Sequence, residues 1–157
     1  DRIKAAVDAR IDDDFVIMAR SDALAVENEE MLLERINSYI EVGADMIFPE
    51  ALVSLDGYKK IAQESSVPVL ANITEFGKTP LFSKKELHDA GVSMVLYPLT
   101  AFRAMSKAAE KIYKELSSSE SQENMLGEMQ TRDELYDYLS YHKYEKEMDE
   151  ILNKKDE

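Results

Sequence analysis

Over its first two thirds, the chain repeats one pattern, in which a short apolar run is followed by a longer stretch with helical periodicity. Short continuous apolar runs such as residues 15–19 are typical of parallel strands buried on both faces. The longer stretches carry apolar residues at helical spacing, as residues 27–41 do with Leu32, Ile36 and Ile40, each four positions apart. Gly43 follows that stretch, where a left-handed glycine ends many helices. The pattern therefore predicts strands that alternate with amphipathic helices.

Four strand–helix units follow a first helix predicted at residues 1–9. The predicted strands are residues 15–19, 46–48, 69–71 and 94–96. The predicted helices after them are residues 27–41, 52–65, 83–90 and 101–116. Consecutive units of this kind have the connection lengths of a parallel α/β fold. Four units amount to half of a (β/α)8 barrel of the TIM type.

The pattern changes after residue 116. The polar segment SSSESQEN is predicted to be a linker, and the tyrosine-rich remainder to residue 153 is predicted to be helical. We expect two domains: half of the barrel at residues 1–118, and the linker with a C-terminal helical segment at residues 119–157. A tail rich in aromatic and charged residues suits a helix that packs on another subunit or across the barrel mouth. The alternative is a solvated, partly ordered tail.

The composition limits the classes of molecule that the chain can bind. The 157 residues carry a formal net charge of -13 and no cysteine. Such a charge disfavours nucleic acid and anionic membranes, and the missing thiols exclude disulfides, thiolate metal sites and a cysteine nucleophile within the chain. No apolar run reaches the roughly 20 residues of a membrane span. We expect a cytoplasmic protein, and because the sequence opens on Asp1 within a predicted helix, we expect a fragment.

Polar side chains follow the predicted strands, at the end of a parallel barrel where active sites lie. Arg20 follows the first strand, Glu50 the second, Asn72 and Thr74 the third, and Arg103 opens the helix after the fourth. Guanidinium groups bind carboxylates through paired hydrogen bonds, and two of them suit a di- or tricarboxylate. The Glu50 carboxylate could act as a base, support a metal ligand or accept a substrate hydroxyl.

Structural roles compete with these assignments. Arg20 could form an ion pair with Asp22 or Glu50 at the barrel rim. Arg103 could neutralise Glu110 or a neighbouring helix. The two histidines lie on predicted helices among charged residues, and solvated imidazoles are the expectation for both.

Four segments together resemble one family: FVIMARSDALAVE, GADMIFPEA, VPVLANITEFGKTPLF and LYPLTAFRAM. They are similar to the 2-methylisocitrate lyases of the isocitrate lyase and phosphoenolpyruvate mutase superfamily, and MQTRDELY in the tail resembles that family's C-terminal segment. The resemblance places this chain in the second half of the barrel, with strands 5 to 8. It implies substrate contacts at Arg20, Glu50, Asn72, Ile73, Thr74, Arg103 and Arg132.

The resemblance implies a Mg2+-dependent enzyme that cleaves 2-methylisocitrate to pyruvate and succinate in propionate breakdown, the methylcitrate cycle. It also implies a homotetramer that exchanges C-terminal helices, so that Arg132 could serve its own or a neighbouring site. The family's metal-binding aspartates and its proton-donating cysteine belong to the first half of the barrel. We therefore expect no metal ligand and no catalytic acid in this chain, and no activity from it alone.

Two alternatives stay open at this stage. One is isocitrate lyase or another enzyme of the same superfamily, although the ITEFGKTP and LYPLTAFRAM segments favour methylisocitrate. The other is a non-catalytic half-barrel that acts as an assembly module through its aromatic-rich tail.

Overall fold

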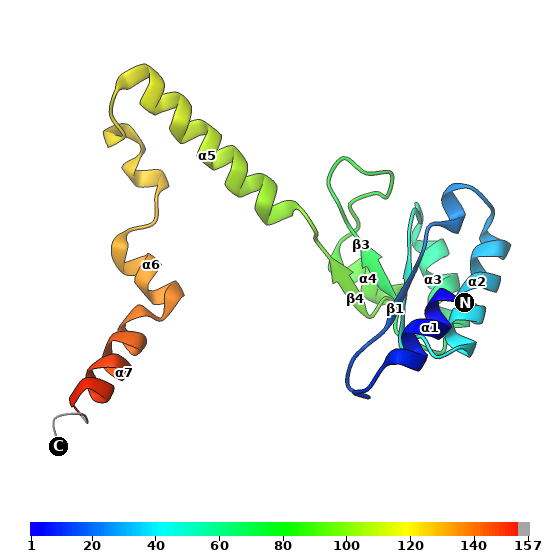
Figure 1. The fold of residues 1–157 in the computed structure, drawn as a ribbon. Coiled ribbons are helices and arrows are strands. Elements are labelled where there is room, and N and C mark those ends of the chain that lie inside the picture. Colours follow the sequence, from blue (N-terminus) through cyan, green and yellow to red (C-terminus); the bar gives the residue numbers. More distant parts are fainter. Residues whose placement is uncertain (154–157) are drawn as a thin grey trace. The chain divides into compact units, whose positions relative to one another are not determined.

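The computed structural model describes residues 1–153 and divides the chain into two compact units, unit 1 (Asp1–Ala104) and unit 2 (Met105–Glu157). The elements of unit 1 alternate as the sequence predicts (Figure 1). They are α1 (Arg2–Ala9), β1 (Met18–Ser21), η1 (Ala23–Ala25), α2 (Glu29–Glu41), β2 (Met46–Pro49), α3 (Leu55–Glu64), β3 (Leu70–Asn72), α4 (Lys84–Asp89) and β4 (Met94–Leu96). The remaining elements are α5 (Thr100–Ser119), which begins in unit 1, and η2 (Glu123–Glu128), α6 (Arg132–Leu139) and α7 (Tyr141–Asn153).

The strands of unit 1 are parallel and follow one another in chain order. β1 pairs with β2, and β3 pairs with β4. An isolated parallel bridge between Ile47 and Val69 links the two pairs, and the Ile47 N–H donates to the Pro68 carbonyl at 3.0 Å. The carboxyl ends of neighbouring strands therefore lie along one edge, where the residues that follow them meet.

The first strand begins later than the apolar run predicts. Pairing starts at Met18 opposite Met46, while Phe15 and Val16 are 66% and 54% exposed. Ile17 does not pair through its N–H with β2, because that N–H donates to the Asp45 carboxylate at 2.8 Å. β1 also ends later than predicted, at Ser21, so Arg20 lies within the strand rather than after it.

Each helix between the strands begins at a polar cap. The side chains of Asn28, Ser54 and Ser83 accept hydrogen bonds from backbone N–H groups in the first turns of α2, α3 and α4. Ser83 and Glu86 form a reciprocal capping box. At the other end of α2, Gly43 has a φ of 101°, as the sequence predicts for a left-handed terminus.

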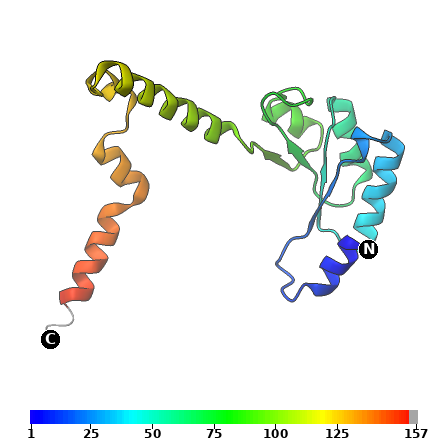
Figure 2. The same cartoon turned by 45° about the horizontal axis from the view of Figure 1, so that its top comes forward.

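The hydrophobic core of unit 1 lies between the strands and these helices, and α2 and α3 are neighbours on one side of the strands in both views (Figures 1 and 2). Alternate strand residues such as Ala19, Ile47 and Ala71 are almost completely buried. Leu32 of α2 and Leu87 of α4 are fully buried against them. This core fixes the strands, and thereby the residues at their carboxyl ends.

Unit 2 consists of helices that bury little. Its helices carry exposed large apolar residues, while Met125 of η2 is 5% exposed. α6 and α7 contact each other, and they are separated at Ser140, whose φ of 53° ends α6 in the left-handed region. Ser117, Ser118 and Ser119 belong to α5, so the helix runs into the predicted linker.

The α/β class predicted from the sequence is confirmed. The described strands form short parallel pairs, and their closure into part of a barrel stays a prediction, as does the domain boundary at residue 118. Among the residues that the structure describes, none of the helices is both long and apolar enough to cross a bilayer.

Candidate functional site

Arg20 lies at the end of β1, with its guanidinium between two carboxylates. Its Nε and Nη2 donate to the two oxygens of Asp22 at 2.9 and 2.8 Å, and Nη2 is 3.4 Å from Oε2 of Glu50. The guanidinium also stands over the ring of Phe48, 4.8 Å from its centre. These contacts on two sides and one face hold the guanidinium at the strand exit.

Glu50 connects the ends of β1 and β3. It follows β2 directly, and its Oε2 accepts a long hydrogen bond of 3.4 Å from Nδ2 of Asn72. The Glu50 N–H donates to the Ser21 carbonyl, which fixes the backbone at this exit. Ala51 then takes a φ of 66°, a left-handed conformation that turns the chain away from the strand. Glu50 therefore contacts side chains from both neighbouring strands.

Asn72 carries an unused acceptor at this point. Its side-chain Oδ1 is buried without a hydrogen-bond partner among the described residues. Buried amide oxygens are normally paired, so such an atom marks a position where a donor is expected. The candidate site thus contains a guanidinium, a carboxylate and an unpaired amide oxygen from three consecutive strand ends.

The hydrogen bonds within this cluster favour the charged forms of Arg20 and Asp22. The pKa of Arg20 is raised, chiefly by its hydrogen bond to Asp22, and the pKa of Asp22 is lowered by the same bond. Burial, with a smaller contribution from the Glu50 charge, raises the pKa of Tyr58 to about 12. Tyr58 therefore stays neutral beside Glu50 at any physiological pH.

The other two residues predicted from the third exit differ in environment. Ile73 is 3% exposed, and its N–H donates to the Leu96 carbonyl at 2.9 Å, which extends the β3–β4 pairing. Thr74 is partly exposed. The Ile73 side chain belongs to the core, so any contact it makes with a ligand would come from its backbone.

Arg103 lies in the first turn of α5 and forms a second cluster with the β3 exit loop. Its Nε is 3.8 Å from Oε2 of Glu75, and its guanidinium stands 5.1 Å from the centre of the Phe76 ring. The other Glu75 oxygen accepts a hydrogen bond from the Thr100 hydroxyl. The suggested pairing of Arg103 with Glu110 is wrong, because Glu110 is bound by Lys107 and Lys114.

Arg132 is the first residue of α6, and Thr131 caps that helix through a capping box with Glu134. It belongs to unit 2, so the structure of unit 1 does not bring it into the cluster. Both histidines are exposed, as expected: His88 lies on α4, and His142 contacts Glu145 at 3.1 Å.

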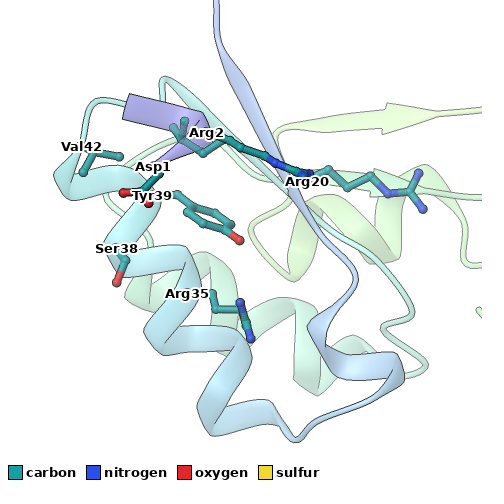
Figure 3. Close-up of a pocket in the computed structure, with 8 residues that line it drawn as sticks. Asp1, Arg2, Arg20, Arg35, Ser38, Tyr39 and Val42 are labelled. Atoms are coloured by element: carbon teal, nitrogen blue, oxygen red, sulfur yellow. The ribbon is translucent and has the colours of Figure 1, made fainter. Parts of the chain in front are cut away.

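A cavity of about 510 Å³ lies beside β1, between α1 and α2. Figure 3 shows Arg35, Ser38 and Tyr39 of α2 on one side, and Arg20 with its guanidinium directed away from them. Arg20 is the one predicted site residue in its lining, and Arg35 is occupied by a paired hydrogen bond to Glu27. The strand-end cluster is therefore the better candidate for a site.

Sequence reasoning missed the roles of Glu75, Thr100 and Phe48. Glu75 stands in the exit loop after β3, so its position gave a signal, but the partner 25 residues further along could not be found from periodicity. Asp22 was anticipated as a partner of Arg20, and the structure confirms that ion pair.

Comparison with known proteins decides the family. The profile of the family described as phosphoenolpyruvate phosphomutase matches residues 1–117. The chain belongs to this family. The 2-methylisocitrate lyase of Salmonella typhimurium is 54% identical over 99% of the chain and 52% of its own length. The enzyme of the same name from Vibrio cholerae is 55% identical over 98% of the chain and 52% of its length.

A solved structure agrees with the family assignment. The crystal structure of 2,3-dimethylmalate lyase, a member of the PEP mutase/isocitrate lyase superfamily, is 27% identical, with a TM-score of 0.85 over 96% of the chain and 53% of that protein. The chain spans about half the length of the curated relatives that it matches and aligns with their C-terminal half. The resemblance predicted from the sequence is thereby confirmed.

The described residues do not fit a magnesium site. No group of three or more histidine, aspartate or glutamate side chains lies close enough within residues 1–153 to hold a metal ion. Both oxygens of Asp22 are bound by the Arg20 guanidinium, and one oxygen of Glu50 lies 3.4 Å from the same cation. Phosphonopyruvate hydrolase, solved with oxalate and Mg2+, shares the fold at 21% identity and a TM-score of 0.76.

Proposed function

We propose that this chain is the substrate-binding half of a carbon–carbon lyase that cleaves 2-methylisocitrate to pyruvate and succinate. The observation that carries the proposal is the meeting of Arg20, Glu50 and Asn72 at three neighbouring strand ends. The relatives named 2-methylisocitrate lyase supply the reaction. We also propose that the four strands form half of a barrel, because a barrel arranges the residues at its strand ends around one substrate.

The arginines suit a substrate with three carboxylates. Nε and Nη2 of Arg20 are bound to Asp22, whereas Nη1 has no hydrogen-bond partner among residues 1–153. Arg103 offers a second guanidinium from the opposite end of the strand series. Each can donate charge-assisted hydrogen bonds to a substrate carboxylate. Arg132 would supply a third guanidinium, from its own tail or from a neighbouring subunit's.

Glu50 and Asn72 suit the substrate hydroxyl. Cleavage of the carbon–carbon bond requires that the hydroxyl lose its proton as the carbonyl of pyruvate forms. The Glu50 carboxylate can accept a hydrogen bond from that hydroxyl, and its position is fixed by Asn72 and Arg20. The backbone at Ile73 and the Thr74 hydroxyl would complete the contacts from the third exit.

The proposal divides the work between two halves. The chain has no cysteine, so the family's thiol acid must come from residues outside it. We also propose that the complete enzyme uses Mg2+ held by residues outside this chain. The chain alone is then inactive. The exposed apolar residues of the tail helices support the exchange of these helices between subunits of a homotetramer. A cytoplasmic location stays a prediction.

A fusion protein tests the function. The first half of the Salmonella typhimurium enzyme, up to the point where the alignment with this chain begins, is joined to residues 1–157. With Mg2+ and 2-methylisocitrate, the fusion is expected to form pyruvate. Arg20→Ala should raise KM or lower kcat/KM by at least about 10-fold, since a charged hydrogen bond contributes about 1.5–3 kcal/mol.

The matched control is Arg35→Ala, an arginine that binds Glu27 and lies on α2. It should change kcat/KM less than about twofold. Turnover of isocitrate in preference to 2-methylisocitrate would assign the fusion to the other lyase of the superfamily. A folded fusion without activity on either acid would favour the assembly module.

A further inference from the structure

The loop after β3 and the start of α5 are joined by a partly buried carboxylate. Glu75 lies in that loop, and its side chain is 25% exposed. Thr100, the first residue of α5, donates its hydroxyl to one carboxylate oxygen. The other oxygen, Oε2, is buried without a hydrogen-bond partner among the described residues and lies 3.8 Å from Nε of Arg103. Glu75 therefore faces Arg103, the residue that binds a substrate carboxylate in the proposed function.

The carboxylate is fixed independently of Arg103. The pKa of Glu75 is lowered, first by the Thr100 hydroxyl, then by a backbone N–H, and by the Arg103 charge. Its charge therefore persists where the substrate is ionised. A buried, charged oxygen without a hydrogen bond strongly favours an approach of the nearest cation.

Arg103 itself has little else to hold it. Its side chain is 43% exposed, and the further guanidinium contact recorded among residues 1–153 is with the ring of Phe76. Phe76 has a φ of 62°, so the loop takes a left-handed turn directly after Glu75. An arginine free to move loses substantial rotamer entropy when it binds a ligand. A fixed anion beside Nε reduces that loss and leaves the two Nη groups to donate to a ligand.

We propose that Glu75 is a positioning residue, which with Thr100 orients the Arg103 guanidinium towards a substrate carboxylate. The inference rests on the proposed function. It assigns Arg103 to a carboxylate on which no charge builds up as the carbon–carbon bond breaks, and such an interaction contributes equally to substrate and transition state. Its loss raises KM and leaves kcat nearly unchanged.

The test uses the fusion enzyme described above. Glu75→Gln keeps an oxygen that accepts from Thr100 and removes the charge that faces Arg103. KM for 2-methylisocitrate should rise about 10-fold, with kcat within about twofold. Thr100→Val should raise KM by about 3-fold, and Thr100→Ser, which keeps the hydroxyl, should recover most of that loss. The control is Asp89→Asn, which removes the exposed i,i+4 ion pair with Lys85.

A measurement without turnover accompanies the kinetics. The Nε–H resonance of Arg103 in the 157-residue chain should shift in Glu75→Gln and stay in place in Asp89→Asn. An unchanged KM in Glu75→Gln, a fall in kcat equal to the rise in KM, or an unmoved Arg103 resonance would overturn the inference. If the unsubstituted fusion is inactive, the proposed function fails first. An active fusion that is indifferent to Glu75 leaves that function intact and removes the positioning role alone.

Discussion

Unit 1 and unit 2 both contain many large apolar residues, but they bury them to different extents. In unit 1, helices and parallel strands share one core, in which Leu32, Ile61 and Leu87 are completely buried. In unit 2, Leu135, Leu152 and most other large apolar residues are more than a third exposed. The difference teaches that unit 1 holds its strand ends by its own packing, whereas the helices of unit 2 leave most of their large apolar side chains exposed.

The largest expected effect on stability comes from replacing a leucine by alanine at matched positions in the two units. Leu32→Ala, at a fully buried position of α2, should lower the free energy of unfolding by about 2–5 kcal/mol, because it leaves a cavity. Leu152→Ala, at a position 55% exposed in α7, should change it by less than about 0.5 kcal/mol. Urea unfolding of the 157-residue chain measures both. Equal losses would remove the distinction between the units.

Matched glycines give the next effect. Gly91 has a φ of 86°, and a Cβ there would lie 2.9 Å from the Cβ of Ala62. Gly91→Ala should therefore cost about 1–3 kcal/mol through backbone strain and crowding. Apart from its two chain neighbours, no described residue has a heavy atom within 4 Å of the Cβ position of Gly127 in unit 2, so Gly127→Ala should be neutral or slightly stabilising. Thermal unfolding of both variants distinguishes these outcomes, and a neutral Gly91→Ala would contradict the tight packing of α3 against the α4–β4 turn.

The two capping boxes sharpen the comparison further. Thr131 with Glu134 caps α6, and Ser83 with Glu86 caps α4. Replacing either Thr131 or Ser83 by alanine should cost its helix about 1 kcal/mol. Because Leu87 anchors α4 in the core, Ser83→Ala should leave its amides protected, whereas Thr131→Ala should speed amide exchange throughout α6. Hydrogen exchange measured by NMR compares them, and similar protection in both variants would count against a weakly anchored α6.

The smallest effect concerns pH. The pKa of Asp45 is lowered, first by the Ile17 N–H and then by Arg10, which donates to it at 2.7 Å. A carboxylate with a lowered folded-state pKa stabilises the fold above its unfolded value, near 3.8, and this contribution is lost as the pH falls through the folded-state pKa. Asp45→Asn should thus flatten the acid dependence of unit 1 below about pH 4. Unfolding followed between pH 2 and 7 would contradict this if both proteins lost stability in parallel.

Much of unit 1 could be predicted because its signals are local. Gly43 marked the end of a helix, and the runs at Met46 and Met94 marked strands. The start of β1 could not be predicted, because the apolar run from Phe15 has the pattern of a strand. The hydrogen bond from the Ile17 N–H to Asp45, which spans 28 residues, cannot be recognised from local sequence. Local signals also did not show that Ser140 would divide the tail helix.

The residues of the candidate site could be predicted only as far as the order of the parallel strands could be predicted. Arg20, Glu50 and Asn72 could be brought together because parallel strands align their carboxyl ends. Glu75 escaped notice, because its partners lie on the next helix and pair through side chains. Arg132 was identified by resemblance alone, and its role stays a prediction.

Reconstitution from two separate halves tests the central claim that this chain supplies the substrate-binding half of a lyase. The first half of the Salmonella typhimurium relative and the 157-residue chain are purified as separate polypeptides, then assayed alone and mixed, with Mg2+ and 2-methylisocitrate. We predict no pyruvate from either half and pyruvate from the mixture, in proportion to the complex formed. Turnover by this chain alone, or a stable complex that forms no pyruvate, would contradict the account.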